Sequence, residues 1–381
     1  MTDFNTQNKS GWVKVAFGDV VKLVRERSNN PELDGFNRVV GLEHLDPGEL
    51  KIIRWADIAD GTTFTNVFRP GQVLFGKRRA YQRKVALASF EGVCSGDIYV
   101  LESSSPQLMP ELLPYICQSD AFFDHAVGTS AGSLSPRTNW TSLANFEFML
   151  PPLQEQARIV EGLQRVESLD SKLKRAFNAA ENVWRAIANA EFMDDRPHKN
   201  SIFDCVTINS GLVDPKLDEF RQQILIGPEH VEKASGILLD KKTVSEQGAI
   251  SGKFRFTPRS VVYSKIRPEL RKVFLADFNG LCSADMYPLL CKDNIIPEYL
   301  LDLLLSDRFT AYAVSCAKRT GMPKLNKEQL GGFKFDPPSL HNQRAYTELA
   351  KNIKTAMAEI KRRSRQLETT KQRMLMNAFE I

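Results

Sequence analysis

Two clusters of lysine and arginine carry the clearest chemistry in this sequence. Each cluster follows a short apolar run, at residues 73–75 in the first case and at residues 261–263 in the second. Cations on a loop after a strand are well placed to neutralise phosphate groups, which supplies affinity without sequence information. The alternative is a set of salt bridges or a solvated basic edge that serves only the fold. The candidate phosphate contacts are Lys77, Arg78, Arg79, Arg83, Lys84, Lys265, Arg267, Arg271 and Lys272.

A second group of polar residues could contact the edges of nucleic-acid bases. Arginine or lysine can bond to guanine O6 and N7, and asparagine to adenine N6 and N7. Asn139 and Asn326 each precede a predicted short helix, so their side chains could cap that helix instead, and the sequence leaves both interpretations open. The candidates in this group are Arg137, Asn139, Lys318, Arg319, Lys324 and Asn326.

Other residues could suggest catalysis, but their context favours structural roles. Glu43-His44 and Glu229-His230 have no further ligands at metal spacing, so we expect turns hydrogen-bonded within each domain. Cys94 and Cys282 lie in apolar strands without a base nearby, so we expect core packing. Residues 336–339 (DPPS) resemble an amino-methyltransferase signature, but no Gly-rich cofactor loop precedes them. We therefore predict no catalytic residue and no metal site in this chain.

The elements that position these residues come in two copies. Residues 73–101 align without a gap to residues 261–289, with identity at 15 of the 29 positions. Shorter matches continue on both sides, including residues 41–44 with 227–230 and residues 136–139 with 323–326. This is a tandem duplication. Residues that distinguish two nucleic-acid sequences should differ between the copies, so we expect them in the dissimilar stretches 46–70 and 232–258.

Each copy is followed by a long amphipathic run that begins at a Pro-Pro pair, at residues 151–152 and 337–338. Apolar residues spaced by three and four along these runs are typical of a coiled coil. In the first run we expect the seam at Ile159, Leu163, Val166, Asp170, Leu173, Phe177, Ala180, Trp184 and Ile187. In the second we expect it at Tyr346, Leu349, Ile353, Ala356, Ile360, Arg363, Leu367, Thr370 and Met374.

The predicted fold class is α+β, with two homologous mixed α/β domains separated and followed by two long helices. We expect these helices to form an antiparallel coiled coil with pseudo-twofold symmetry. The predicted segments are a first domain at residues 1–152 (1–10 as a flexible tail), a first helix at 153–196, a second domain at 197–338 and a second helix at 339–381.

Composition limits the function without deciding it. The net charge is +5, but it is −2 over residues 1–152 and +3 over 197–338, so any nucleic-acid contact must come from local clusters. The six cysteines form no CxxC pair, which is typical of free thiols in a reducing compartment. No apolar run approaches the roughly 18 to 20 residues of a membrane span. We therefore expect a cytoplasmic protein that does not contact membranes.

The ordered set of motifs, present twice, resembles the specificity (S) subunits of Type I restriction-modification systems. The residues that carry the resemblance are Gly-x-Glu-His at 41–44 and 227–230, Cys-Ser-x-Asp-x-Tyr in both repeated blocks, and Pro-Pro-Leu-Gln-Glu-Gln at 151–156. The second helix start departs from the pattern, with Ser339 in place of leucine.

The resemblance implies a non-catalytic subunit whose two target-recognition domains bind the two halves of a split site in double-stranded DNA. It also implies that the helices dock two modification subunits, which bind S-adenosylmethionine and transfer the methyl group. The chain itself would need no cofactor. Restriction subunits with motor and nuclease activity would complete the assembly.

Overall fold

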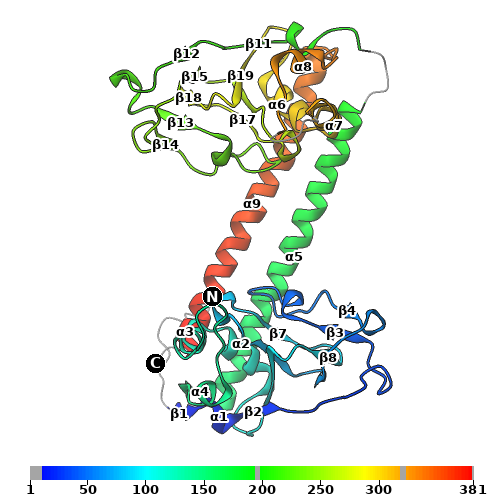
Figure 1. Ribbon diagram of the computed structural model, residues 1–381, viewed down its shortest axis with the longest axis vertical. Coiled ribbons are helices and arrows are strands. Elements are labelled where there is room, and N and C mark those ends of the chain that lie inside the picture. Colours follow the sequence, from blue (N-terminus) through cyan, green and yellow to red (C-terminus); the bar gives the residue numbers. More distant parts are fainter. Residues whose placement is uncertain (1–10, 194–197, 318–322, 380–381) are drawn as a thin grey trace. The chain divides into compact units, whose positions relative to one another are not determined.

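The computed structural model describes residues 11–193, 198–317 and 323–379, and the chain divides into two compact units. Unit 1 contains residues 1–174 and 362–381, and unit 2 contains residues 175–361. Each unit therefore includes one globular region and a part of both long helices, whereas the sequence suggested four consecutive segments. Both units combine sheets with helices, which confirms the α+β class (Figure 1). The flexible tail expected at residues 1–10 lies outside the described residues.

The globular region of unit 1 contains two four-stranded sheets and one two-stranded sheet. The sheets have the orders β2-β9-β6-β7, β4-β3-β8-β5 and β1-β10, and β3 and β8 pair in parallel. The strands are β1 (Val13–Ala16), β2 (Val21–Val24), β3 (Arg38–Val40), β4 (Ala56–Asp57), β5 (Asn66–Phe68), β6 (Val73–Gly76), β7 (Val85–Leu87), β8 (Gly92–Cys94), β9 (Ile98–Ser103) and β10 (Glu147–Leu150). The helices are α1 (Phe17–Val20), α2 (Leu113–Gln118), α3 (Asp120–Gly128), α4 (Trp140–Ala144) and the start of α5 (Leu153–Phe192).

Unit 2 repeats the two larger sheets, with one further strand, β12, at the edge of the second. Its sheets have the orders β11-β19-β16-β17 and β12-β15-β18-β13-β14, again with one parallel pair, β13 with β18. The strands are β11 (Val206–Ile208), β12 (Leu212–Val213), β13 (Ile224–Ile226), β14 (Lys242–Thr243), β15 (Lys253–Phe256), β16 (Val261–Ser264), β17 (Val273–Leu275), β18 (Gly280–Cys282) and β19 (Met286–Cys291). The helices are α6 (Pro297–Leu305), α7 (Asp307–Cys316), α8 (Lys327–Gly332) and α9 (Leu340–Phe379).

Residues 77–84 and 265–272, which contain the two clusters of lysine and arginine, are called the cationic loops. The strand before each cationic loop is buried on both faces. In β6, Val73 and Phe75 point into the core shared with the helices, and Leu74 points into the second core, which lies between the sheets. In β16, Val261 and Tyr263 alternate with Val262 in the same way. Side chains alternate across a strand with a period of two, so a strand between two cores must be apolar at every position. This explains why both loops follow a continuous apolar run.

A glycine kept in both copies allows two strands to approach closely. A Cβ atom on Gly92 would lie 2.4 Å from the carbonyl oxygen of Arg38, and one on Gly280 would lie 2.8 Å from that of Ile224. Neither backbone oxygen can move without breaking the parallel pair, so only glycine fits at these positions.

The seam of α5 lies where the sequence predicted it, since Ile159, Leu163 and the following positions are buried or half-buried. The seam predicted for α9 is wrong at four positions. Leu349, Ala356, Arg363 and Thr370 are exposed, and the residues that turn inward each come one position later, at Ala350, Met357, Ser364 and Lys371. The observed spacing in α9 is four then three, as in α5. The prediction failed because it spaced the seam residues of α9 by three and then four positions from Tyr346. That spacing places Leu349 in the seam, although this apolar residue faces outward.

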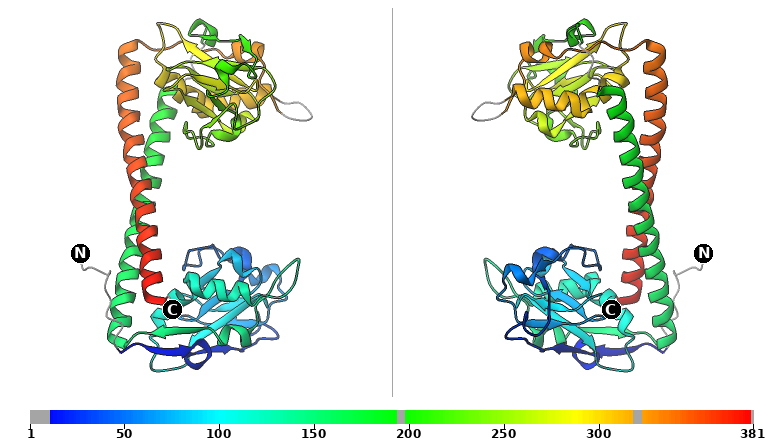
Figure 2. Two further views of the ribbon diagram at one scale, coloured as in Figure 1. Left: turned by 90° about the vertical axis from the view of Figure 1, so that its left-hand side faces the viewer. Right: turned by 90° about the vertical axis from the view of Figure 1, so that its right-hand side faces the viewer.

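Polar contacts join the two helices within each unit. In unit 1, Glu167 accepts from Lys371 at 3.0 Å, and Asp170 accepts from the Ser364 hydroxyl at 2.5 Å. In unit 2, the Lys354 ammonium lies 5.2 Å from the centre of the Trp184 ring. The Lys361 ammonium likewise lies 5.3 Å from the centre of the Phe177 ring. In both units the number of the α9 partner falls as the α5 number rises, so the helix segments run antiparallel in each unit (Figure 2).

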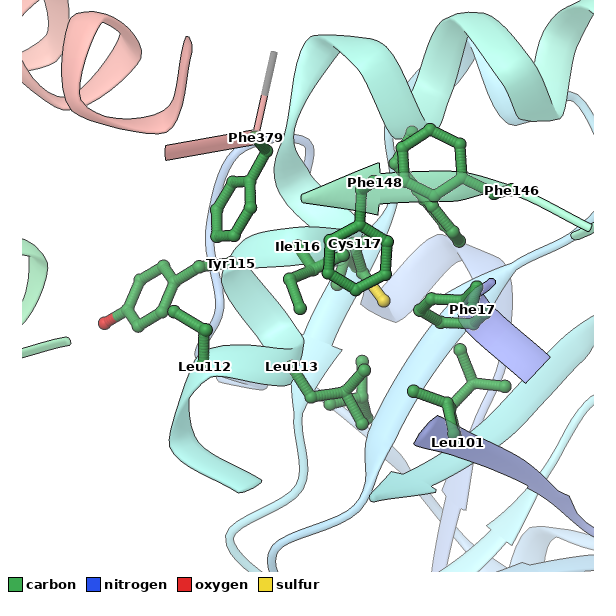
Figure 3. Close-up of a cluster of buried hydrophobic side chains, with 14 of the residues drawn as sticks. Phe17, Leu101, Leu112, Leu113, Tyr115, Ile116, Cys117, Phe146, Phe148 and Phe379 are labelled. Atoms are coloured by element: carbon green, nitrogen blue, oxygen red, sulfur yellow. The ribbon is translucent and has the colours of Figure 1, made fainter. Parts of the chain in front are cut away.

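Both long helices contribute to the globular core of each unit. The core of unit 1 includes Ile159 and Leu163 from the start of α5, and Leu375, Ala378 and Phe379 from the end of α9. Figure 3 shows the Phe379 ring beside Tyr115 and Leu112 of unit 1. The core of unit 2 includes Ala188 and Phe192 from the end of α5, and Tyr346 and Ala350 from the start of α9. Among the described residues, no helix is long and apolar enough to cross a membrane.

Candidate nucleic-acid interface

The two cationic loops have the same backbone frame. After β6, the Lys77 N–H donates to the carbonyl of Asp97 at 3.0 Å, and the Arg79 N–H donates to that of Pro136 at 2.7 Å. After β16, Lys265 and Arg267 make the matching bonds to Asp285 and Pro323, at 2.9 Å each. Matching long-range backbone hydrogen bonds therefore hold the two loops in the same conformation.

Two arginines in each loop have left-handed backbone angles. Arg79 and Arg83 have φ of 53° and 56°, and Arg267 and Arg271 have φ of 49° and 48°. This conformation costs a residue with a Cβ atom roughly 1–2 kcal/mol, so a non-glycine residue kept there twice needs a reason.

The reason for Arg83 and Arg271 is structural. Arg83 pairs with Asp120 and lies 4.6 Å from the centre of the Phe123 ring. Arg271 pairs with Asp307 at 2.7 Å and donates to the Leu305 carbonyl at 3.2 Å. Each arginine thereby ties its loop to the start of α3 or α7, and neither guanidinium is free for a phosphate.

Lys84 and Lys272 also bond within the fold. The Lys84 ammonium donates to the Leu42 carbonyl at 2.6 Å, and that of Lys272 donates to the Pro228 carbonyl at 2.7 Å. These bonds satisfy carbonyls of the two Gly-x-Glu-His turns. Both lysines therefore stabilise the fold, and their ammonium groups are not free to bind phosphate.

Asp97 and its counterpart Asp285 bind further candidates. Asp97 pairs with Arg137 at 2.9 Å and with Arg78 at 3.3 Å. Burial alone would raise the pKa of the Asp97 carboxyl, but the bonds from Arg137 and Arg78 outweigh burial and lower it. In unit 2, Asp285 pairs with Lys324 at 3.1 Å, while Ile266 takes the place of Arg78.

Asn139 and Asn326 are helix caps. The Asn139 side chain accepts from the Ser142 N–H at the start of α4, at 2.8 Å. Asn326 accepts from the Gln329 N–H at the start of α8, also at 2.8 Å. Because the amide oxygen of each side chain accepts the capping bond, only its NH₂ group is free to contact a base. Lys318 and Arg319 lie outside the described residues.

Arg79 and Arg267 are exposed, and among the described residues neither guanidinium has a hydrogen-bond or ion-pair partner. Lys77 and Lys265 lack a carboxylate partner in the same part of the chain, and their ammonium groups lie 4.7 Å and 5.1 Å from the ring centres of Tyr99 and Tyr287. Burial and the nearby Lys324 lower the pKa of Lys265. Of the predicted phosphate contacts, these four are the ones with a free cationic group.

Unit 1 also contains a cleft that the sequence analysis did not identify. It has a volume of about 430 Å³ and is lined by Arg25, Arg27, Asn66 and Lys77, with threonine side chains between them. Arg25 and Arg27 are exposed and, among the described residues, neither has an ion-pair partner. The one hint in the sequence was the Arg-Glu-Arg triplet at 25–27, which places two cations on one face of an extended chain.

The groups that could suggest catalysis have structural partners. His44 Nδ1 accepts from the Gly41 N–H at 2.9 Å, and His230 Nδ1 accepts from the Gly227 N–H at the same distance, which confirms the expected turns. Burial raises the pKa of Cys94 and of Cys282 to about 12. Asp336 accepts from two backbone N–H groups, of Lys199 and Asn200, at 3.0 Å each. In the described part of the chain, no group of His, Cys, Asp and Glu could hold a metal.

Comparisons with known proteins agree with this architecture. Residues 9–180 match the family model of the Type I restriction modification DNA specificity domain. The specificity subunit of the Type I restriction enzyme EcoDI from Escherichia coli is 36% identical over 125 residues, which cover 33% of this chain and 28% of that protein. The matched region is thus less than a third of the length of this curated relative.

Two solved structures share the fold over nearly the whole chain. One comes from a study of complex assembly and conformational transition of the type I R-M system, with a TM-score of 0.62, 21% identity and coverage of 97% of both chains. The other is the Type-I restriction-modification system S subunit from M. genitalium, with a TM-score of 0.62, 14% identity and full coverage of both chains.

The fold and the matched cationic loops define a tandem-repeat protein with two homologous mixed α/β regions and two long helices. Residues 9–180 thus match the Type I restriction modification DNA specificity domain, in agreement with the motif resemblance.

Proposed function

We propose that this chain is the DNA-recognition subunit of a Type I restriction-modification complex, and that each unit binds one half of a split target. The observation that carries the proposal is the pair Arg79 and Arg267. Both are exposed, strained in the left-handed region and without an ion-pair partner in the described residues, and they occupy the same place in the two units. Both copies retain a strained backbone conformation at an exposed arginine whose side chain has no ion-pair partner among the described residues. Such strain is typical of a residue that binds a ligand.

Phosphate contact is the role that fits these arginines. A guanidinium presents N–H groups that match phosphate oxygens, and Lys77 and Lys265 add a second cation to each loop. Contacts shared by both units supply affinity and orientation, since a phosphate is the same in every sequence.

We propose further that the long helices bind two modification subunits. Large apolar side chains on the helices are exposed although the seam is buried: Leu153, Leu169 and Val183 on α5, and Leu340, Leu349 and Met376 on α9. A partner that covers these side chains would remove their apolar surface from water. In this proposal S-adenosylmethionine, methyl transfer, DNA translocation and cleavage belong to the modification and restriction partners.

The proposal is tested by expressing the chain with the modification subunit of its own system and mapping methylated bases by long-read sequencing. We expect two specific blocks of sequence separated by a fixed number of unspecified base pairs, and no methylation when the chain is omitted. Methylation that persists without the chain, or a continuous target, would exclude it.

The phosphate contacts are tested by Arg79→Gly together with Arg267→Gly. We expect weaker binding of the assembled complex to target and unrelated DNA alike, and a salt dependence flatter by about two units of slope, one for each lost contact. Glycine tolerates the left-handed conformation, so the thermal stability should not fall.

The matched control is Arg83→Gly together with Arg271→Gly, which changes arginines in the same conformation that are bound inside the fold. Here we expect lower thermal stability, because two ion pairs are lost, and an unchanged salt slope. If instead the first variant relaxed the specificity of one half-site, Arg79 and Arg267 would be base contacts and the assignment to phosphates would be wrong.

A further inference from the structure

The cleft in unit 1 lies where the chain passes from one sheet to the other. After β2, residues 25–28 leave the sheet that contains β9 and pair with the segment around β5. The Ser28 N–H donates to the Thr65 carbonyl at 2.9 Å, and the Val67 N–H donates to the Glu26 carbonyl at 3.0 Å. The cleft therefore has a rigid backbone wall, and Arg27 stands directly opposite Asn66 in this pairing.

The cleft is cationic because the side chains of Arg25 and Arg27 point into it. Arg25 and Arg27 both line it, as expected for positions i and i+2 of an extended segment. Glu26 between them pairs with Arg69 at 2.6 Å and is absent from the cleft lining. The acid therefore does not neutralise the two arginines. Lys77 lines the same cleft, so three cations meet hydrogen-bonding side chains from Thr63, Thr65 and Asn66.

The corresponding place in unit 2 has different chemistry. Asn66 opposes Cys94 in unit 1, and Phe254 opposes Cys282 in unit 2, so Phe254 takes the place of Asn66. Leu212 opposes Phe254 as Arg27 opposes Asn66, which places Ser210 at the position of Arg25. Lys77 and Tyr99, in contrast, are kept as Lys265 and Tyr287.

We propose that the cleft of unit 1 binds the base edges of one half-site, and that Arg27 and Asn66 are specificity-determining residues for that half. This inference rests on the proposed function. Residues that contact phosphates can be the same in both units, whereas residues that contact bases must differ if the two half-sites differ. Lys77 satisfies the first condition, and Arg27 and Asn66 satisfy the second.

The chemistry of the pair suits a purine-containing step. Arginine forms two hydrogen bonds with guanine O6 and N7, and asparagine forms two with adenine N6 and N7. The threonine hydroxyls can donate or accept at neighbouring positions. Arg25 adds charge at the rim of the cleft, where it assists binding of the backbone.

The experiment uses the complex of the full chain with its modification subunits, and DNA libraries in which each half-site is randomised one position at a time. Arg27→Ala and Asn66→Ala should each lose about five- to one-hundred-fold of discrimination at one position of a single half-site. The other half-site should keep its full specificity. Arg27→Leu with Asn66→Phe, which installs the residues of unit 2, should relax both positions.

Lys14→Ala is the matched control, since Lys14 is an exposed cation of unit 1 that pairs with Glu147 at 2.6 Å and does not line the cleft. It should leave both half-sites unchanged. Thermal unfolding of each variant confirms that the chain is folded, because Arg27 is exposed and its loss should cost little stability.

The possible failures are distinguishable. A wild-type complex that methylates no split site would overturn both the proposed function and this inference. If the wild type methylates a split site but the cleft variants leave both half-sites intact, only the inference fails. It fails equally if binding weakens to the same extent on every sequence, because Arg27 and Asn66 would then contact the DNA backbone.

Discussion

The same residue type has different roles at neighbouring positions of the cationic loops. Arg79 and Arg83 are both arginines in the left-handed region, and both are kept in the second copy as Arg267 and Arg271. Yet Arg83 is held by Asp120, while Arg79 is exposed. Identity between the two copies therefore marks residues that hold the fold as well as those available to a ligand.

Asp97 gives a pH-dependent test of one such structural contact. Its pKa is lowered in the folded protein because Arg137 and Arg78 favour the charged carboxylate. The stability that it contributes is thus present above the unfolded pKa of about 3.9 and is lost as the pH falls through the lower folded value. We expect Asp97→Asn to reduce the free energy of unfolding by about 0.5–1 kcal/mol at pH 7, given that Arg137 is half-exposed.

Urea unfolding of the wild type and Asp97→Asn between pH 7 and pH 3 measures this difference, which should shrink below about pH 4. Asp285→Asn is the control, with a smaller effect at pH 7 because Asp285 pairs with one lysine, Lys324, among the described residues. A difference that stays constant over this range would show that the charge of Asp97 is not what stabilises the fold.

At the scale of elements, a buried glutamine fixes the start of each long helix. Gln156 in α5 accepts from the Met109 N–H at 2.8 Å and donates to the carbonyls of Gln107 and Pro151, at 2.6 Å and 2.8 Å. Gln343 in α9 makes the same three bonds, to Ile296, Asn294 and Pro338, at 2.9, 2.9 and 2.8 Å. This explains why the glutamine is kept after Pro-Pro in both copies, although residues 339–342 depart from the pattern of the first helix start.

We expect Gln156→Ala to destabilise unit 1 by about 1–3 kcal/mol, because it removes a fully buried side chain and leaves the Met109 N–H and the carbonyls of Gln107 and Pro151 without this partner. Hydrogen exchange should become faster around residues 107–118 and at the start of α5. Gln343→Ala should cause a similar loss around residues 294–305 and at the start of α9. Faster exchange spread evenly over the chain in both variants would contradict a local role.

At the scale of the whole molecule, the end of the chain belongs to the core of the first unit. Leu375, Ala378 and Phe379 are at most 2% exposed and belong to one buried cluster with residues of α2 and α5. Figure 3 shows the Phe379 ring beside Tyr115 of α2. We expect Phe379→Ala to destabilise unit 1 by about 3 kcal/mol, as for other buried phenylalanines.

The neighbouring Met376→Ala is the control for this change. Met376 is 40% exposed, so its truncation should change the free energy of unfolding by less than about 0.5 kcal/mol. Thermal unfolding of both variants measures the contrast. Equal effects would mean that the last turn of α9 is not anchored in the core.

The helices also make a prediction about target spacing, which rests on the proposed function. Phe177 contacts Lys361, and Trp184 contacts Lys354, so residues 175–181 of α5 oppose residues 357–363 of α9. Deleting both segments removes one heptad from each helix and keeps the seam in phase. Each helix shortens by about 10.5 Å, so the gap between the two specific blocks should shorten by up to about three base pairs.

Deleting residues 175–181 alone is the control. Each core holds both helices, so helices of unequal length cannot fill both cores, and methylation should be lost. Methylation mapping measures both outcomes. Unchanged spacing after the paired deletion, or altered half-site sequences with an unchanged gap, would contradict the idea that the helices set the spacing.

The sequence by itself determined the features that depend on local pattern. The duplication, the apolar strands before the cationic loops, the Gly-x-Glu-His turns and the two long helices all follow from repeats and periodicity within short windows. Even the seam of α9 was encoded in this way: the seam of α5 shifted by the repeat offset of 187 residues gives Ala350, Met357, Ser364 and Lys371.

Only the tertiary structure decided which cations are free. Arg83 meets Asp120 across 37 residues, and Arg137 meets Asp97 across 40. The backbone of Arg27 pairs with that of Asn66, which is also distant in the sequence. No local window contains these partners, because a side chain's partner is set by how distant segments pack. For the same reason, no local pattern could show that the last turn of α9 completes the core of unit 1.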